Sequence, residues 1–147
     1  MKIWIRNLQK PIPLDLRELR KIAKRILNEA ALPEAELSIS FVDDGQIQEL
    51  NRRYLGRDKP TNVLAFSMAE GAFVSVNPQL LGDVIVSVDT ARRQSNRFGL
   101  NGTEMIILLM IHGILHLLGY EHEGTKKGAA EMVKKQKELF QQAIRKA

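Results

Sequence analysis

The three histidines of the chain lie within eleven residues, at positions 112, 116 and 122. On an α-helix, His112 and His116 are one turn apart on the same face, so both imidazoles can reach one ion. Gly119 allows the chain to turn out of the helix and to bring His122 round as a third ligand. Three neutral imidazoles with an open fourth position are typical of catalytic zinc, which acidifies a bound water. The spacing therefore predicts one Zn²⁺ per chain and a hydrolytic reaction.

The same spacing, H-x-x-x-H-x-x-G-x-x-H, is found in metzincin peptidases. In those enzymes the residue after the first histidine is Glu, which acts as the general base of peptide hydrolysis. Gly113 stands at that position in this chain. The pattern therefore keeps the metal ligands and lacks the base, which argues against proteolysis.

The bulk composition predicts a single domain over residues 1–147, long enough to bury a core without disulfides. The absence of cysteine excludes thiolate metal sites and suits the reducing cytoplasm. The N-terminus has no long apolar segment, and the apolar run 105–118 is too short and too polar at its centre to span a bilayer. We therefore expect a cytoplasmic protein with no membrane partner. The net charge of +5 favours a nucleic acid partner.

The elements that must position the histidines follow from hydrophobic periodicity and capping residues. Strand patterns cover 2–7, 37–41, 63–68 and 82–88, and 70–81 is expected to be a surface loop. Helical patterns cover 16–27, 47–54, 91–98, the histidine segment after the cap 101–104, and 125–145. The last helix is expected to bury Met132, Val133, Leu139, Phe140 and Ile144. The order β-α-β-α-β-β-α-α-α predicts an α+β domain with about four strands covered by helices.

Several segments resemble one known family. Residues 112–122, H-G-I-L-H-L-L-G-Y-E-H, resemble the signature H-G-x-L-H-L-x-G-Y-D-H of the bacterial YbeY family of endoribonucleases and ribosomal RNA maturation factors. Residues 50–54 (LNRRY), 58–67 (DKPTNVLAFS) and 81–87 (LGDVIVS) resemble the family's L-N-x-x-Y, D-K-P-T-N-V-L-S-F and L-G-D-I-x-I-S segments in the same order and spacing. The resemblance implies a metzincin-like α+β fold, with a mixed sheet and a central histidine-bearing helix.

The resemblance also implies a function. The implied function is that of a zinc-dependent endoribonuclease of the single-strand type, which acts in maturation of the 16S ribosomal RNA 3′ end and in ribosome quality control. The implied partners are ribosomal RNA and, beyond it, a ribosomal subunit or an assembly GTPase.

Two positions depart from the family pattern. Glu121 replaces the usual Asp, and we expect it to transfer a proton or to orient a ligand histidine, the alternative being a solvated loop acid. Leu55 replaces the Arg that commonly follows the tyrosine, so Arg57 is the candidate phosphate clamp and second catalytic residue. The basic cluster expected to bind RNA phosphates is Arg52, Arg53, Arg57 and Lys59, with a solvated basic face as the alternative.

Other interpretations fit the same residues. The protein could be an RNA-binding ribosome-assembly factor with a mainly structural zinc, or a metal-dependent hydrolase of another substrate. Three imidazoles also accept nickel, copper or iron. Either water or the RNA 2′-hydroxyl could be the nucleophile.

Overall fold

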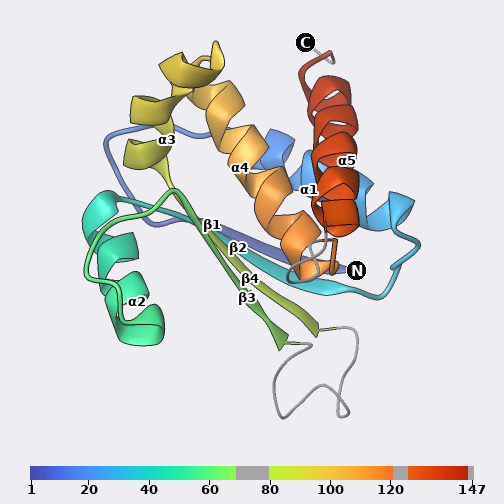
Figure 1. Cartoon of the computed structure of the whole chain (residues 1–147), viewed down its shortest axis with the longest axis horizontal. Helices are drawn as coiled ribbons and strands as arrows, with labels where there is room; N and C mark the ends of the chain where they lie inside the picture. Colours follow the sequence, from blue (N-terminus) through green and yellow to red (C-terminus); the bar gives the residue numbers. More distant parts are fainter. Residues whose placement is uncertain (69–79, 121–125, 146–147) are drawn as a thin grey trace.

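The computed structural model describes residues 1–68, 80–120 and 126–145 (Figure 1). Its element order agrees with the order predicted from periodicity, with one short 3₁₀ turn, η2 (Asn96–Phe98), added after α3. The strands are β1 (Lys2–Asn7), β2 (Glu36–Val42), β3 (Val63–Ser67) and β4 (Leu80–Ser87). The helices are α1 (Leu16–Glu29), α2 (Asp44–Leu55), α3 (Val88–Ser95), α4 (Gly102–Leu117) and α5 (Lys126–Ile144).

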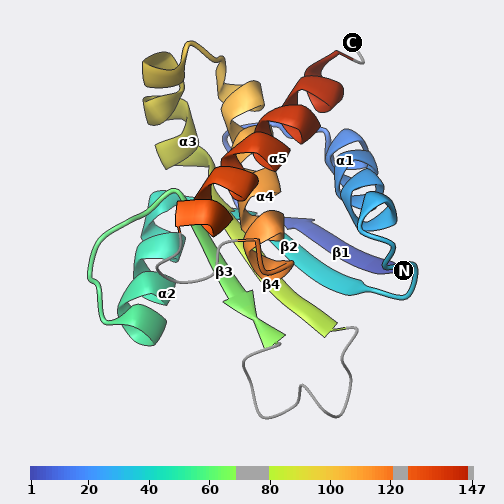
Figure 2. The same cartoon turned by 45° about the vertical axis from the view of Figure 1, so that its right-hand side comes forward.

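The four strands form one mixed sheet in the order β1-β2-β4-β3. Strands β1, β2 and β4 are parallel, and β3 pairs antiparallel with β4 at the edge. Helices α1 and α4 cover one face of the sheet and α5 packs on α4, whereas α2 lies at the other face (Figures 1 and 2). The predicted α+β domain with about four strands and a central histidine-bearing helix is therefore confirmed.

Helix α4 lies close against the sheet because one of its contact residues has no side chain. A Cβ atom at Gly113 would come within 2.6 Å of Val84 Cγ1 on β4 and within 3.2 Å of Val63 Cγ2 on β3. The flanking residues Ile111 and Ile114 are fully buried. Gly113 therefore sets the distance between the histidine-bearing helix and the two strands beside it.

The ends of α4 form as the sequence predicts. Asn101 and Glu104 make a complete capping box, in which each side chain accepts from the other residue's backbone N–H. Gly119 has a φ of +84°, a left-handed conformation that residues with a side chain rarely adopt. The chain therefore turns out of the helix where the sequence predicted the turn.

Three predictions need correction. The predicted loop 70–81 ends too late, because Leu80 already begins β4; residues 70–79 lie outside the described residues. Helix α3 begins at Val88 rather than at 91, since Ser87 ends the strand and its hydroxyl accepts from the Thr90 N–H as a cap. Val133 is 67% exposed rather than buried, because it faces solvent while its neighbour Met132 faces α4.

Among the helices that the structure describes, no single one is long and apolar enough to cross a membrane. The segments Val88–Phe98 and Gly102–Leu117 pass that test only together, by length and composition, and are bent by 104° relative to each other.

Candidate metal centre and substrate cleft

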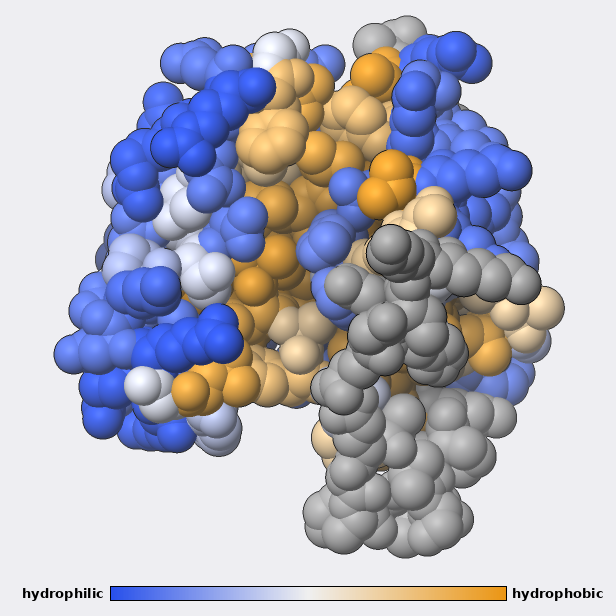
Figure 3. All heavy atoms as spheres, in the orientation of Figure 1, coloured by the Kyte–Doolittle hydropathy of each residue, from blue (hydrophilic) through white to orange (hydrophobic). Residues whose placement is uncertain are grey.

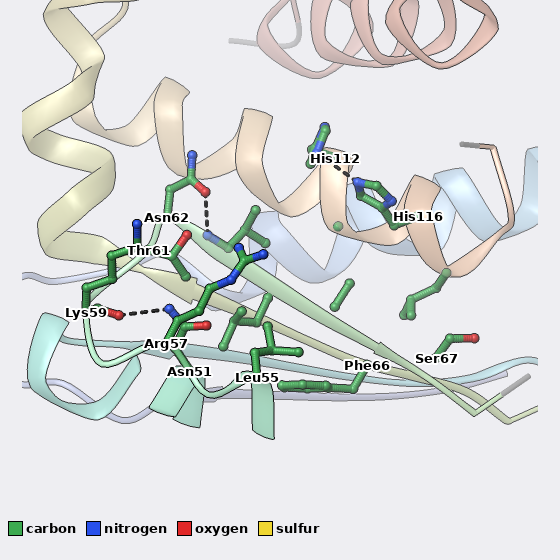
Figure 4. Close-up of a pocket in the computed structure, with 15 residues that line it drawn as sticks. Asn51, Leu55, Arg57, Lys59, Thr61, Asn62, Phe66, Ser67, His112 and His116 are labelled. Atoms are coloured by element: carbon green, nitrogen blue, oxygen red, sulfur yellow. Dashed lines mark hydrogen bonds between the residues drawn. The ribbon is translucent and has the colours of Figure 1, made fainter. Parts of the chain in front are cut away.

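A cleft of about 730 Å³ lies between α4 and the edge strand β3. One wall carries His112, Gly113 and His116 of α4, and the other carries β3 together with the segment 56–62 that precedes it (Figure 4). Figure 3 shows a band of apolar surface along α4, bordered by hydrophilic surface. The histidines are therefore polar groups at an otherwise apolar helix that borders an open cavity.

The two histidines point their Nε2 atoms at each other. Residues at every fourth position of α4, including Leu108, His112 and His116, form its partly exposed stripe, and the remaining faces are mostly buried. The two Nε2 atoms lie 3.1 Å apart, and the ring planes are inclined by 79°. Two nitrogens bound to one tetrahedral Zn²⁺ at about 2.05 Å would be about 3.3 Å apart. This pair therefore fits two neighbouring ligand positions on one ion.

A glutamine on α5 holds one of the two rings. The Oε1 atom of Gln136 lies 2.7 Å from His112 Nδ1 in a partly buried contact. Because an amide oxygen can only accept, His112 Nδ1 carries the proton and Nε2 keeps its lone pair for the cleft. Metal-binding histidines commonly donate their second N–H to such a partner. The sequence analysis missed Gln136, which is 24 residues from His112 and carries no local signal.

The third predicted ligand, His122, and the predicted catalytic residue Glu121 lie outside the described residues. Within 1–68, 80–120 and 126–145, no three His, Cys, Asp or Glu side chains are grouped to hold a metal ion. The backbone N–H of Gly119 bonds to the carbonyl of His116 at 3.0 Å, so the chain leaves α4 directly beside the second histidine. The assignment of His122 and Glu121 stays a prediction.

Arg57 and Lys59 line the cleft, on the wall opposite the histidines. Gly56 ends α2 with a φ of +70°, and the buried Asn51 side chain donates to the Lys59 carbonyl at 2.9 Å, which fixes the loop between them. Arg57 extends into the cleft (Figure 4). In the described part of the chain, neither Arg57 nor Lys59 has an ion-pair partner. Both cations therefore lie where they can contact an anionic ligand beside the histidines.

Arg52 and Arg53 are not brought to the cleft. On the solvent side of α2, Arg52 forms an ion pair with Glu49 at 2.5 Å, and Arg53 lies 3.9 Å from the same carboxylate. The hydrogen bond from Arg52 lowers the pKa of Glu49. Leu55, at the position where an arginine was expected, does line the cleft. Among the described residues, the cationic side chains on this wall are thus those of the loop, and α2 contributes the uncharged Asn51 and Leu55.

Comparison with known proteins covers almost the whole chain. The family model described as endoribonuclease YbeY matches residues 4–144. The endoribonuclease YbeY of Syntrophus aciditrophicus (strain SB) is 49% identical over 141 residues, which cover 95% of this chain and 88% of that protein. The endoribonuclease YbeY of Syntrophotalea carbinolica is 50% identical over 139 residues, which cover 94% and 93%. The matched segments include the cleft and both described histidines.

Among solved structures, the fold is similar to the solution structure of TM1509 from Thermotoga maritima. The TM-score is 0.68 at 26% sequence identity, and the alignment covers 96% of this chain and 88% of that chain. The similarity therefore extends over the sheet and the helices together.

Proposed function

The chain belongs to the YbeY family of metal-dependent endoribonucleases, and from this premise we propose that it is a zinc enzyme of ribosomal RNA maturation. The family assignment confirms the resemblance seen in the sequence, and with it an enzyme that hydrolyses RNA. The finer proposal is that zinc is held by His112, His116 and His122. The proposed substrate of the enzyme is single-stranded ribosomal RNA at the 16S 3′ end. The enzyme is also proposed to act in ribosome quality control.

The observation that carries the zinc proposal is the 3.1 Å approach of the His112 and His116 Nε2 atoms at the wall of an open cleft. When bound, a divalent ion at this position supplies polarisation of a phosphodiester oxygen or activation of a water. Gln136 orients His112 by accepting its Nδ1–H. In the proposal, His122 completes the ligand set and Glu121 transfers the proton.

The basic side chains are proposed to divide the work of RNA binding. Arg57 and Lys59 bind backbone phosphates within the cleft, where they face the histidines and pair with no carboxylate of residues 1–68, 80–120 or 126–145. Arg52 and Arg53 bind RNA more weakly, because Glu49 already compensates their charge. Arg57 acts as the phosphate clamp in place of the arginine that Leu55 replaces.

The same proposal extends to the domain organisation, the location and the partners of the protein. We propose that residues 1–147 form one domain, which is supported by a family match over 4–144. We also propose that the protein works in the cytoplasm, with ribosomal RNA and a ribosomal subunit or an assembly GTPase as partners. The net charge of +5 supports association with such polyanionic assemblies.

The proposal is tested by incubating purified ribosomal RNA with zinc-loaded protein, with chelated protein and with the His116→Ala variant. We expect cleavage by the zinc-loaded protein alone. Full cleavage by metal-free His116→Ala protein would refute a metal mechanism. RNA binding without any cleavage by the zinc-loaded protein would favour the assembly factor with a structural zinc.

Two further variants test whether Arg57, rather than Arg52, binds the RNA phosphate during cleavage. Arg57→Ala should lower RNA cleavage about tenfold, the cost of one hydrogen-bonded charge contact, while zinc content is unchanged. Arg52→Ala is the matched control, five residues away on α2, and it should lower cleavage by about twofold at most, because its partner is Glu49. Equal losses in both variants would contradict Arg57 as the clamp.

A further inference from the structure

A second cavity, of about 350 Å³, opens on the face of the sheet away from the histidines. Its volume is at the lower end of the range for small-molecule sites, about 300–1,000 Å³. It brings together residues of three elements, of which α2 and β3 also contribute to the histidine cleft. These residues are Leu50 and Tyr54 of α2, Phe66 of β3, and Asp83 and Ile85 of β4.

Successive side chains of β4 point to opposite faces of the sheet, and Asp83 lies on the face of the second cavity. Val84 packs against α4, where its Cγ1 atom approaches Gly113. Its neighbours along the strand point the other way, and Ile85 belongs to the small apolar cluster beneath α2. Asp83 therefore points away from the histidines and cannot orient them.

The cavity has an aromatic wall. Tyr54 and Phe66 pack with ring centroids 5.4 Å apart and planes inclined by 60°. Tyr54 nevertheless stays 59% exposed. An exposed aromatic ring beside a cavity is a surface on which a nucleobase can stack.

Among the described residues that line this cavity, one is a charged acceptor. Asp83 is exposed, and in the described part of the chain its carboxylate has no hydrogen-bond or ion-pair partner. The other lining residues are apolar apart from the Tyr54 hydroxyl. An ionised carboxylate offers two oxygens that only accept, so the site suits a flat ligand with two adjacent N–H donors.

This cavity and the cleft share one lining residue at the edge strand. Phe66 lines both of them, from a strand whose other side faces the histidines. In Figure 4, Phe66 lies on the side of the β3 ribbon away from His112 and His116. A single strand of RNA that crosses β3 can therefore occupy the cleft with one nucleotide and the cavity with a neighbouring one.

We propose that this cavity binds one base of the RNA substrate and prefers guanine. The base stacks on Tyr54, and the Asp83 carboxylate accepts from guanine N1–H and N2–H. Uracil offers a single N–H between two carbonyls, while adenine and cytosine place an acceptor beside their amino group, so only guanine presents two adjacent donors there. The inference rests on the proposed function, since it takes RNA to be the ligand of the adjoining cleft.

The test measures binding of the full chain to uridine heptamers with guanosine, inosine or uridine at the centre, by fluorescence anisotropy. Inosine lacks only the 2-amino group, so we expect guanosine to bind about tenfold more tightly, as for one hydrogen bond to a charged group. Asp83→Asn should abolish this preference. Tyr54→Leu should weaken binding of all three heptamers about fivefold or more, and Tyr54→Phe should restore it.

Matched controls are Glu131→Gln, an exposed acid on α5, and Phe98→Leu, whose side chain is 58% exposed and lies outside the cavity. Both should bind like the parent protein. The comparison of guanosine with inosine needs no variant, so a poorly folded variant does not remove the test. Equal binding of the two heptamers by the parent protein, or no binding of either, would overturn the proposal.

Cleavage of the same heptamers is scored separately on gels. Cleavage without a guanine preference in binding would reject the base site and leave the nuclease standing. A guanine preference that depends on Asp83, without cleavage, would support the base site and count against the proposed nuclease.

Discussion

Replacing Gln136 by methionine is expected to weaken metal binding at His112 while leaving the fold intact. The Gln136 Oε1 atom accepts the His112 Nδ1–H at 2.7 Å, across the contact between α5 and α4. Methionine has a similar length and volume but cannot replace a strong acceptor. The substitution therefore removes the hydrogen bond and keeps the packing.

The expected magnitude follows from what the hydrogen bond does. It fixes the Nδ1–H tautomer and the ring orientation that keep His112 Nε2 within 3.1 Å of His116 Nε2. Loss of such an outer partner typically costs 10- to 100-fold in metal affinity. That range corresponds to about 1.4–2.7 kcal/mol. Gln136 is uncharged and only partly buried, so the free energy of unfolding of the metal-free protein should change by less than about 1 kcal/mol.

Two measurements check this prediction without relying on nuclease activity. Zinc affinity is obtained by competition with a chromophoric chelator. The tautomer of His112 in the metal-free protein is read from ¹⁵N shifts and two-bond couplings of its ring. The parent protein should show the Nδ1–H form, and Gln136→Met should lose it.

Two further variants separate orientation from structure. Gln136→Glu keeps an acceptor and adds a charge near the metal, so its zinc affinity should equal or exceed that of the parent protein. Gln142→Met replaces an exposed glutamine on the same helix and should change nothing. The reasoning fails if Gln136→Met binds zinc within about twofold of the parent protein. It also fails if the parent protein shows the Nε2–H tautomer.

Two other predictions concern the scaffold. Gly113→Ala should destabilise the protein by about 1–3 kcal/mol in chemical denaturation, because the new Cβ would lie 2.6 Å from Val84 Cγ1. Helix propensity alone predicts the opposite, a stability gain of about 1 kcal/mol, and such a gain would contradict this packing argument. Burial raises the pKa of Asp44, but hydrogen bonds from Thr90, Arg93 and Ser87 outweigh it and the pKa is lowered. The stabilisation by Asp44 is therefore complete above the unfolded-state pKa near 4 and is lost as the pH falls through the lower folded-state pKa. Asp44→Asn should cost about 1–2 kcal/mol at pH 7 and progressively less in acid; a difference independent of pH between 7 and 2 would refute the assignment.

The features that could be predicted from the sequence are local ones. The helix of the histidines was predictable because its cap, its apolar run and the i, i+4 spacing of His112 and His116 all lie within one continuous segment. The turn after it was predictable because Gly119 adopts a positive φ that few other residues adopt. Such signals depend on neighbours within a few residues, and tertiary packing left them unchanged.

The features that could not be predicted depend on contacts between distant segments. Gln136 meets His112 only because α5 crosses α4, and nothing near Gln136 in the sequence indicates a metal site. Arg52 and Arg57 belong to one predicted basic cluster, yet the end of α2 at Gly56 turns Arg57 into the cleft and leaves Arg52 paired with Glu49. Charge patterns identify such a cluster but not the direction in which each member points.

The structure explains why a glycine follows the first histidine, which the sequence alone does not. In the sequence, Gly113 marks the absence of the peptidase base. In the structure, even one carbon at that position would meet Val84 and Val63, so a glutamate there would push α4 off the sheet. Close packing thus excludes a base at position 113. For the proton acceptor of RNA cleavage we propose another position, Glu121, two residues beyond the turn at Gly119.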